Sequence, residues 1–172
     1  DILTIAKYIL DKGLKICLHF IADGRDTLPQ SAPNYIKLIQ QNLGGYFDNG
    51  RVVWGTISGR YYAMDRNQNM DRTKIAIDAI ANAESKYVAN NIEDALQDAY
   101  ARGETDEFIW PTVIKGDVPV TKKDGFLFGN YRSDRARQIM REILKTNAHI
   151  LCFSQYGEGL NELCPALIDD ET

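Results

Sequence analysis

Residues 14–21 are LKICLHFI, a short apolar run that ends shortly before the turn-prone pair Asp23-Gly24. Strand-forming residues bounded by such a turn predict a buried β-strand. Before it, residues 2–10 repeat apolar side chains with a helical period, which indicates an amphipathic helix. A second helix is predicted after it, with Ser31 as its N-cap. A strand between two helices is the repeating unit of an α/β fold.

The same alternation continues along the rest of the chain. Further strands are predicted at residues 51–58, 125–131 and 149–153, and helices around residues 76–80, 91–102 and 136–144. Pro111 and Pro119 interrupt two short segments that otherwise resemble strands. Because proline cannot donate a ladder hydrogen bond, we expect these segments to be edge or hairpin strands. We therefore predict one domain over residues 1–172, with a three-layer α/β/α fold and a mostly parallel sheet that carries an edge hairpin.

Composition narrows the class of protein. Of the 172 residues, 44% are hydrophobic and 26% are charged, which is enough apolar surface for one compact core. A formal net charge of −4 disfavours nucleic-acid binding, because long-range attraction to a polyanion is weak. The chain has no apolar run of membrane-spanning length and no basic signal segment, so we expect a cytoplasmic protein. Its three cysteines form no CxxC pair, which favours a reducing compartment.

Arginines follow the predicted strands. Arg25 comes after the first strand, Arg60 after the second and Arg132 after the third, each close to the carboxyl end where open α/β sheets bind ligands. A guanidinium group suits carboxylates and phosphates, so converging loops would form a pocket for a small phosphorylated acid. Asp26, set among these arginines, would be ionised and would accept hydrogen bonds from substrate hydroxyls, which suggests proton transfer.

Arg132 and Arg135 also lie at the start of a predicted helix, where each cation opposes the helix dipole by about 0.3–1 kcal/mol. An anion bound at that helix start would reverse the sign of this effect. The alternative is that the arginines are solvated surface residues. Asp134 would then offset Arg132 and Arg135, and Asp65 would pair with Arg66.

No metal site is predicted from this chain alone. We interpret Cys17 and His19 as packed core residues of the first strand, one on each side of the sheet, and neither histidine has a partner at zinc-finger spacing. Nucleotide-binding glycine loops and the nucleophile elbow of α/β-hydrolases are also missing from the sequence.

Four segments, in order along the chain, resemble the 2,3-bisphosphoglycerate-independent phosphoglycerate mutases. They are HFIADGRDTLPQSAP (residues 19–33), SGRYYAMDR (58–66), TDEFIWPTVI (105–114) and NYRSDRARQ (130–138). The resemblance covers one of that family's two domains, the phosphotransferase or substrate-binding domain, which is inserted into a phosphatase-like domain. Because the chain begins with Asp1, we expect an excised or processed piece of a longer protein. Leu28 and Met70 depart from the family pattern, which puts packing in doubt more than chemistry.

The resemblance implies roles for the residues already singled out. Asp26 would be the catalytic acid/base at the glycerate hydroxyls, and Arg25 would contact the glycerate with it. Four further arginines would hold carboxylate and phosphate: Arg60, Arg66, Arg132 and Arg135. The substrate would be 2- or 3-phosphoglycerate, an intermediate of glycolysis and gluconeogenesis.

The resemblance also implies what this chain lacks. The phosphatase domain of the same polypeptide would supply a serine that carries the phosphoryl group and two divalent metals, with manganese expected, so no cofactor is expected in this chain. The isolated chain should therefore be inactive as an isomerase. A stand-alone phosphometabolite-binding or sensor module is the alternative of a different class.

Overall fold

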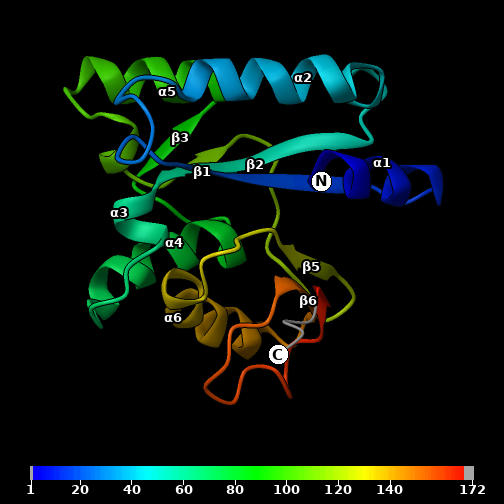
Figure 1. Ribbon diagram of the computed structural model, residues 1–172. Helices are drawn as coiled ribbons and strands as arrows, with labels where there is room; N and C mark the ends of the chain where they lie inside the picture. Colours follow the sequence, from blue (N-terminus) through cyan, green and yellow to red (C-terminus); the bar gives the residue numbers. More distant parts are fainter. Residues whose placement is uncertain (1, 169–172) are drawn as a thin grey trace.

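The computed structural model describes residues 2–168 and arranges their strands in two sheets (Figure 1). The four-stranded sheet has the order β1-β2-β4-β3, and the three-stranded sheet has the order β5-β6-β7. The first contains β1 (Ile16–Ala22), β2 (Val52–Gly59), β4 (Thr112–Ile114) and β3 (Tyr87–Ala89), and the second contains β5 (Gly125–Phe128), β6 (His149–Ser154) and β7 (Ala166–Ile168). All strand pairs are parallel except β2 with β4.

Helices cover both faces of the four-stranded sheet (Figure 1). On one face lie α2 (Ala32–Asp48) and α5 (Ile92–Ala101), and on the other lie α3 (Arg60–Ala63), α4 (Met70–Asn82) and α6 (Ser133–Ile143). Helix α1 (Ile2–Asp11) packs against α2 and β1. Two short 3-10 helices, η1 (Asp106–Phe108) and η2 (Leu144–Thr146), complete the described elements.

Three buried clusters hold these layers together. The first joins α2 and α5 to the four-stranded sheet around Ile57, which is fully buried. The second joins α4 and α6 to the three-stranded sheet around Ile139. The third lies beneath α1 around Leu10. Because each helix contributes one apolar face to a cluster, helical periodicity in the sequence translates directly into the layers of the fold.

The predicted α/β class is confirmed, whereas the details of the sheet differ. The strands predicted at residues 14–21, 51–58, 125–131 and 149–153 are present as β1, β2, β5 and β6, but they belong to two sheets instead of one. The predicted edge hairpin is wrong: β4 lies between β2 and β3, and all three of its residues are buried. Pro111 immediately precedes β4, so its missing N–H removes no ladder bond, and Pro119 is in no strand.

The predicted helix caps are half right. Asn91 caps α5, because its side chain accepts a hydrogen bond from Asp94 N at 2.7 Å. Ser31 precedes α2 but makes no side-chain cap bond to it. Instead, the buried carboxylate of Asp106 accepts hydrogen bonds from Ser31 N and Ala32 N, each at 2.8 Å. A residue of η1, far along the chain, thus caps α2 and fixes η1 to it.

Close backbone packing also places η1 against the ends of β1 and β2. A Cβ on Gly24 would lie 2.6 Å from Glu107 N, and a Cβ on Gly59 would clash with the Glu107 carbonyl group. Gly59 N donates to Ile109 O at 2.8 Å. Both glycines therefore allow η1 to lie directly beside the loops that carry the predicted arginines.

Candidate functional site

The loops after β1, β2 and β5 converge as predicted. Arg60 begins α3 directly after β2, and its buried guanidinium donates hydrogen bonds to Asp23 and, at 2.7 Å, to Asp26, both of which follow β1. Arg132, which follows β5, lies 3.5 Å from the same Asp26 carboxylate. One carboxylate therefore connects residues from three separate loops at the carboxyl edge of β1 and β2.

The Asp23 carboxylate shapes the turn that presents Arg25 and Asp26. It accepts hydrogen bonds from the backbone N–H groups of both residues, each at 3.2 Å. Partial burial raises the pKa of Asp23, but the hydrogen bond from Arg60 and the two backbone bonds outweigh burial, so the pKa lies below its usual value. Asp23 is consequently a structural anion, whereas the Asp26 side chain remains 59% exposed and accessible to a ligand.

Arg66 follows α3, and Arg135 lies in the first turn of α6. Arg66 pairs with Asp134 at 2.6 Å, and Arg132 lies 3.5 Å from the same carboxylate. Arg135 donates to the carbonyl of Met64 at 3.1 Å, and its buried Nε has no hydrogen-bond partner among residues 2–168. Burial, followed by repulsion from Arg66, Arg60 and Arg132, lowers the pKa of Arg135.

The site therefore keeps an excess of positive charge at the start of α6. Arg132 occupies the N-cap position of this helix and makes no side-chain cap bond. The interpretation of these arginines as fully neutralised surface residues is only partly right, because Asp134 pairs with Arg66 and Arg132 but leaves Arg135 without a carboxylate partner among the described residues. An anion at this helix start would be stabilised by the guanidinium groups and by the helix dipole together.

A cavity of about 380 Å³ opens between the loops. It is lined by Arg25, Arg60, Tyr61, Asp65, Arg66, Asn67, Arg72, Glu107, Phe108 and Arg135. Arg25 extends into solvent, with its side chain 61% exposed and 3.7 Å from Glu107. The cavity is large enough for a small phosphorylated acid, and five of its lining residues are arginines, which suit an anion.

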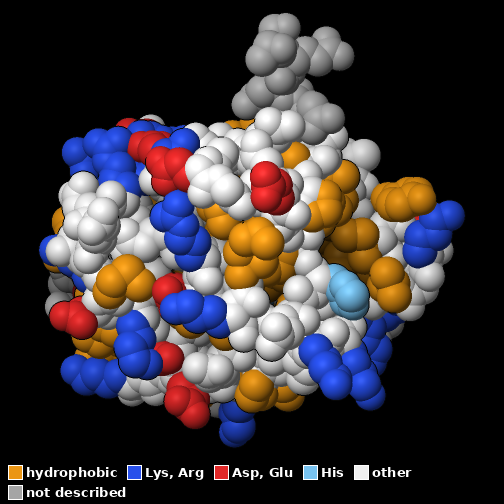
Figure 2. Space-filling view, turned by 90° about the horizontal axis from the view of Figure 1, so that it is seen from below, with side chains coloured by type: hydrophobic (Ala, Val, Ile, Leu, Met, Phe, Trp, Pro, Cys, Tyr) orange, Lys and Arg blue, Asp and Glu red, His pale blue; other side chains and the backbone are white. Residues whose placement is uncertain are grey.

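Two further arginines of α6 lie outside this site. Arg137 and Arg141 both pair with Glu158, at 2.7 and 3.0 Å. Figure 2 shows one face of the molecule on which basic side chains are interspersed with acidic ones instead of forming one basic stripe. Arg137 and Arg141 are therefore paired with an acidic residue and do not line the cavity.

Comparison with known proteins identifies the family of this chain. Residues 1–160 match the family described as BPG-independent PGAM N-terminus, in which BPG is 2,3-bisphosphoglycerate and PGAM is phosphoglycerate mutase. The chain belongs to this family. A 2,3-bisphosphoglycerate-independent phosphoglycerate mutase of Methanosarcina acetivorans is 38% identical over 92% of this chain and 33% of its own length. The corresponding Clostridioides difficile enzyme is 44% identical over 82% of this chain and 28% of its own length.

The fold is shared with a solved structure as well. A Leishmania mexicana phosphoglycerate mutase aligns with 98% of this chain and 34% of its own, with a TM-score of 0.86 and 18% identity. This mutase-family chain thus spans about a third of the relatives it matches. Among the described residues, no helix is both long and apolar enough to cross a membrane.

Several cavity residues were not predicted from the sequence. Asp65 was paired with Arg66 only in the alternative of solvated surface arginines. It is buried, lies 3.6 Å from Arg72 and accepts hydrogen bonds from the N–H groups of Asn67 and Asn69. It therefore anchors the loop that carries Arg66. Tyr61 was also missed; Arg72 lies over its ring at 3.9 Å.

Glu107 and Phe108 were missed too, although one segment of the resemblance to the mutase family, residues 105–114, contains both of them. Residue type alone gave no signal, because a glutamate beside a phenylalanine is an ordinary sequence.

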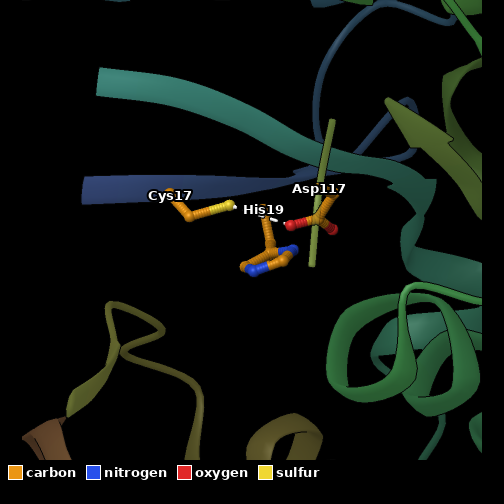
Figure 3. Close-up of side chains that lie close together, drawn as sticks. All are labelled: Cys17, His19 and Asp117. Carbon is orange, nitrogen blue, oxygen red and sulfur yellow. Dashed lines mark hydrogen bonds between the residues drawn. The ribbon is translucent and has the colours of Figure 1, made fainter. Parts of the chain in front are cut away.

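The interpretation of Cys17 and His19 on opposite sides of the sheet is wrong. They are two residues apart in β1, and alternate residues of a strand share a face. Both side chains point toward Asp117, which lies in the loop after β4 (Figure 3).

Proposed function

We propose that this chain is the substrate-binding domain of a 2,3-bisphosphoglycerate-independent phosphoglycerate mutase. The observation that carries the proposal is the convergence of arginines from three loops on one cavity, with the half-buried Arg135 beside other cations and without a carboxylate partner among residues 2–168. The family to which the chain belongs supports the same activity. The proposed substrate is 2- or 3-phosphoglycerate, whose two anionic groups match a cavity with several guanidinium groups.

In this proposal each side chain has a separate task. Arg66, Arg132 and Arg135 bind the anionic groups at the start of α6, and Arg25 closes the exposed side of the cavity. Arg60 holds Asp26 in position through their 2.7 Å hydrogen bond. Asp26 contacts the glycerate hydroxyls, gives a proton to the oxygen that loses the phosphoryl group, and then accepts the proton of the hydroxyl that takes that group up.

The chemistry of phosphoryl transfer would come from the second domain that the family resemblance implies. Two divalent cations bound there would act as Lewis acids on the phosphoryl oxygens, beside the serine that carries the group. The arginine-lined cavity does not suit such cations, because its excess charge is already positive. This chain would therefore bind and orient the glycerate, which contributes to catalysis by positioning. A glycolytic role and three free cysteines support a cytoplasmic location.

A panel of four anions tests the proposal: 3-phosphoglycerate, glycerol 3-phosphate, glycerate and sulfate, each titrated calorimetrically into the chain at constant ionic strength. We expect 3-phosphoglycerate to bind best, because it alone offers carboxylate and phosphate together. Binding should be weak, with a dissociation constant of about 1 mM, because the chain lacks the groups proposed for the second domain. Equal binding of all four anions would contradict a phosphoglycerate site. Binding at about 1 μM or tighter would instead favour a stand-alone sensor module.

A further inference from the structure

A cluster of three different donor groups lies outside the arginine cavity. Cys17 Sγ, a ring nitrogen of His19 and a carboxylate oxygen of Asp117 all lie within 4.8 Å of one another (Figure 3). Cys17 and His19 come from one face of β1, and Asp117 comes from the loop after β4. The proposed phosphoglycerate site uses none of the three.

The backbone of β2 makes room for this cluster. The pairing of β1 with β2 shifts between Leu18 and His19, which pair with Trp54 and Thr56, so Gly55 is an extra residue in β2. A Cβ on Gly55 would lie 2.6 Å from Cys17 Sγ and 2.7 Å from His19 Cε1. A glycine at a β-bulge therefore leaves space for a thiol and an imidazole side by side, as bulges near functional sites commonly do.

Contacts with neighbouring residues fix the imidazole and the carboxylate. His19 Nδ1 lies 3.0 Å from Thr56 Oγ1, and its ring stacks on Phe126 with centroids 6.3 Å apart. Asp117 follows Gly116, whose φ of +100° turns the chain toward β1. Asp117 Oδ1 accepts hydrogen bonds from Val118 N at 2.9 Å and from Cys17 Sγ at 3.3 Å.

The second carboxylate oxygen of Asp117 points to a missing ligand. Asp117 Oδ2 is buried and has no hydrogen-bond partner among residues 2–168. An unpaired carboxylate oxygen away from water is costly, so its position beside a thiol and an imidazole needs a compensating group. A divalent cation would compensate it directly.

We propose that Cys17, His19 and Asp117 bind a thiophilic divalent cation of the Zn²⁺ type. One sulfur, one nitrogen and one oxygen donor suit zinc, and a thiolate with a carboxylate balances its charge. Donor atoms of a tetrahedral zinc site lie about 3.3–3.6 Å apart, so small side-chain rotations would close the present arrangement. On binding, the S–H bond of Cys17 breaks, the sulfur bonds the metal and the proton leaves to solvent. Three protein ligands leave one position for water on the exposed side of Cys17.

Cobalt(II) titration of the full 172-residue chain under reducing conditions tests this site, because tetrahedral cobalt with a thiolate ligand absorbs visibly and shows a sulfur-to-metal charge-transfer band. We expect one cobalt per chain, displacement by zinc, and a rise in melting temperature that a chelator reverses. No saturable complex, or a spectrum of six-coordinate cobalt without the charge-transfer band, would show that the cluster is only a hydrogen-bonded network.

Three single variants and a control locate the site. Cys17→Ser should lose the charge-transfer band, and His19→Gln and Asp117→Asn should each weaken cobalt binding. His149→Gln, which alters the exposed histidine at the start of β6, should bind cobalt like the wild type. An unchanged band in Cys17→Ser would assign the metal to the buried thiols Cys152 and Cys164 and overturn the proposal. Circular dichroism of each metal-free variant distinguishes lost binding from lost folding.

Discussion

Arg60 connects the loops of the proposed site through its contacts with Asp23 and Asp26. Its guanidinium is buried, whereas the Asp23 and Asp26 side chains that it contacts are 34% and 59% exposed. Because both carboxylates can be partly resolvated, we expect Arg60→Met to destabilise the protein by about 1–3 kcal/mol, less than the loss of a fully buried pair. Arg25→Ala should cost less than about 1 kcal/mol, because Arg25 is mostly exposed. Urea unfolding of both variants measures the difference, and equal losses would contradict the central role of Arg60.

The same ion pair predicts how stability depends on pH. Burial raises the pKa of Asp23, but the hydrogen bonds from Arg60 and from the backbone lower the pKa by more than burial raises it. The pKa is therefore depressed in the folded state. A depressed carboxylate pKa stabilises the fold above the unfolded value of about 3.9, and this stability is lost as the pH falls through the folded value. Wild-type protein should therefore lose more stability between about pH 5 and pH 2 than Arg60→Met does. Parallel stability curves for the two proteins would show that Arg60 does not set this pKa.

At the residue scale, the sequence predicted the side chains that follow strands and missed those whose partners are distant backbone groups. Arg60 and Arg132 follow strand ends, so their convergence could be inferred from the topology of α/β sheets. Asp106 accepts hydrogen bonds from N–H groups that are 75 and 74 residues away, and no spacing in the sequence reveals such contacts.

At the element scale, η1 determines how α2 is joined to the site. The Asp106 carboxylate caps α2 from 74 residues away in sequence and also accepts a hydrogen bond from Tyr100. Asp106→Ala should cost about 2 kcal/mol or more, because it leaves buried N–H groups without a charged acceptor. Asn91→Ala, which removes the exposed cap of α5, should cost about 1 kcal/mol. Urea unfolding compares them; a smaller loss for the Asp106 variant would mean that η1 does not support α2.

Helical periodicity predicted where the helices lie better than it predicted which strands are paired with one another. The apolar positions of α6 were visible in the sequence, and the structure buries Ala136, Ile139, Met140 and Ile143. The position of β4 was not visible, because a strand of three residues carries almost no period and its antiparallel pairing with β2 depends on distant residues. The division of the strands into two sheets was missed for the same reason.

At the scale of the whole molecule, the described residues contain a complete set of packed layers. Three buried clusters join the helices to the two sheets, so we expect the 172-residue chain to unfold in one cooperative thermal transition. Calorimetry with a matched van't Hoff analysis is the check. A broad transition whose calorimetric and van't Hoff enthalpies disagree would show that the chain needs its proposed second domain in order to fold.

We expect no mutase activity from the isolated chain. The proposed site positions glycerate but contributes no phosphorylatable serine, so turnover of 3-phosphoglycerate coupled to enolase should stay at the level of the blank. Manganese should not change this result, because the cavity that binds the substrate is already positively charged. Turnover that increases with protein concentration and persists through repeated purification would contradict the division of tasks between two domains.

NMR can locate the bound ligand directly on the protein. Titration of isotope-labelled chain with 3-phosphoglycerate should shift signals of the loops after β1, β2 and β5, with ionic strength held constant so that screening does not imitate binding. Arg135→Ala should lose a charge-assisted hydrogen bond worth about 1.5–3 kcal/mol and weaken binding about tenfold or more. Arg141→Ala, on the same helix but paired with Glu158, should bind like the wild type. Equal weakening in both variants, or shifts confined to other surfaces, would contradict the proposed site.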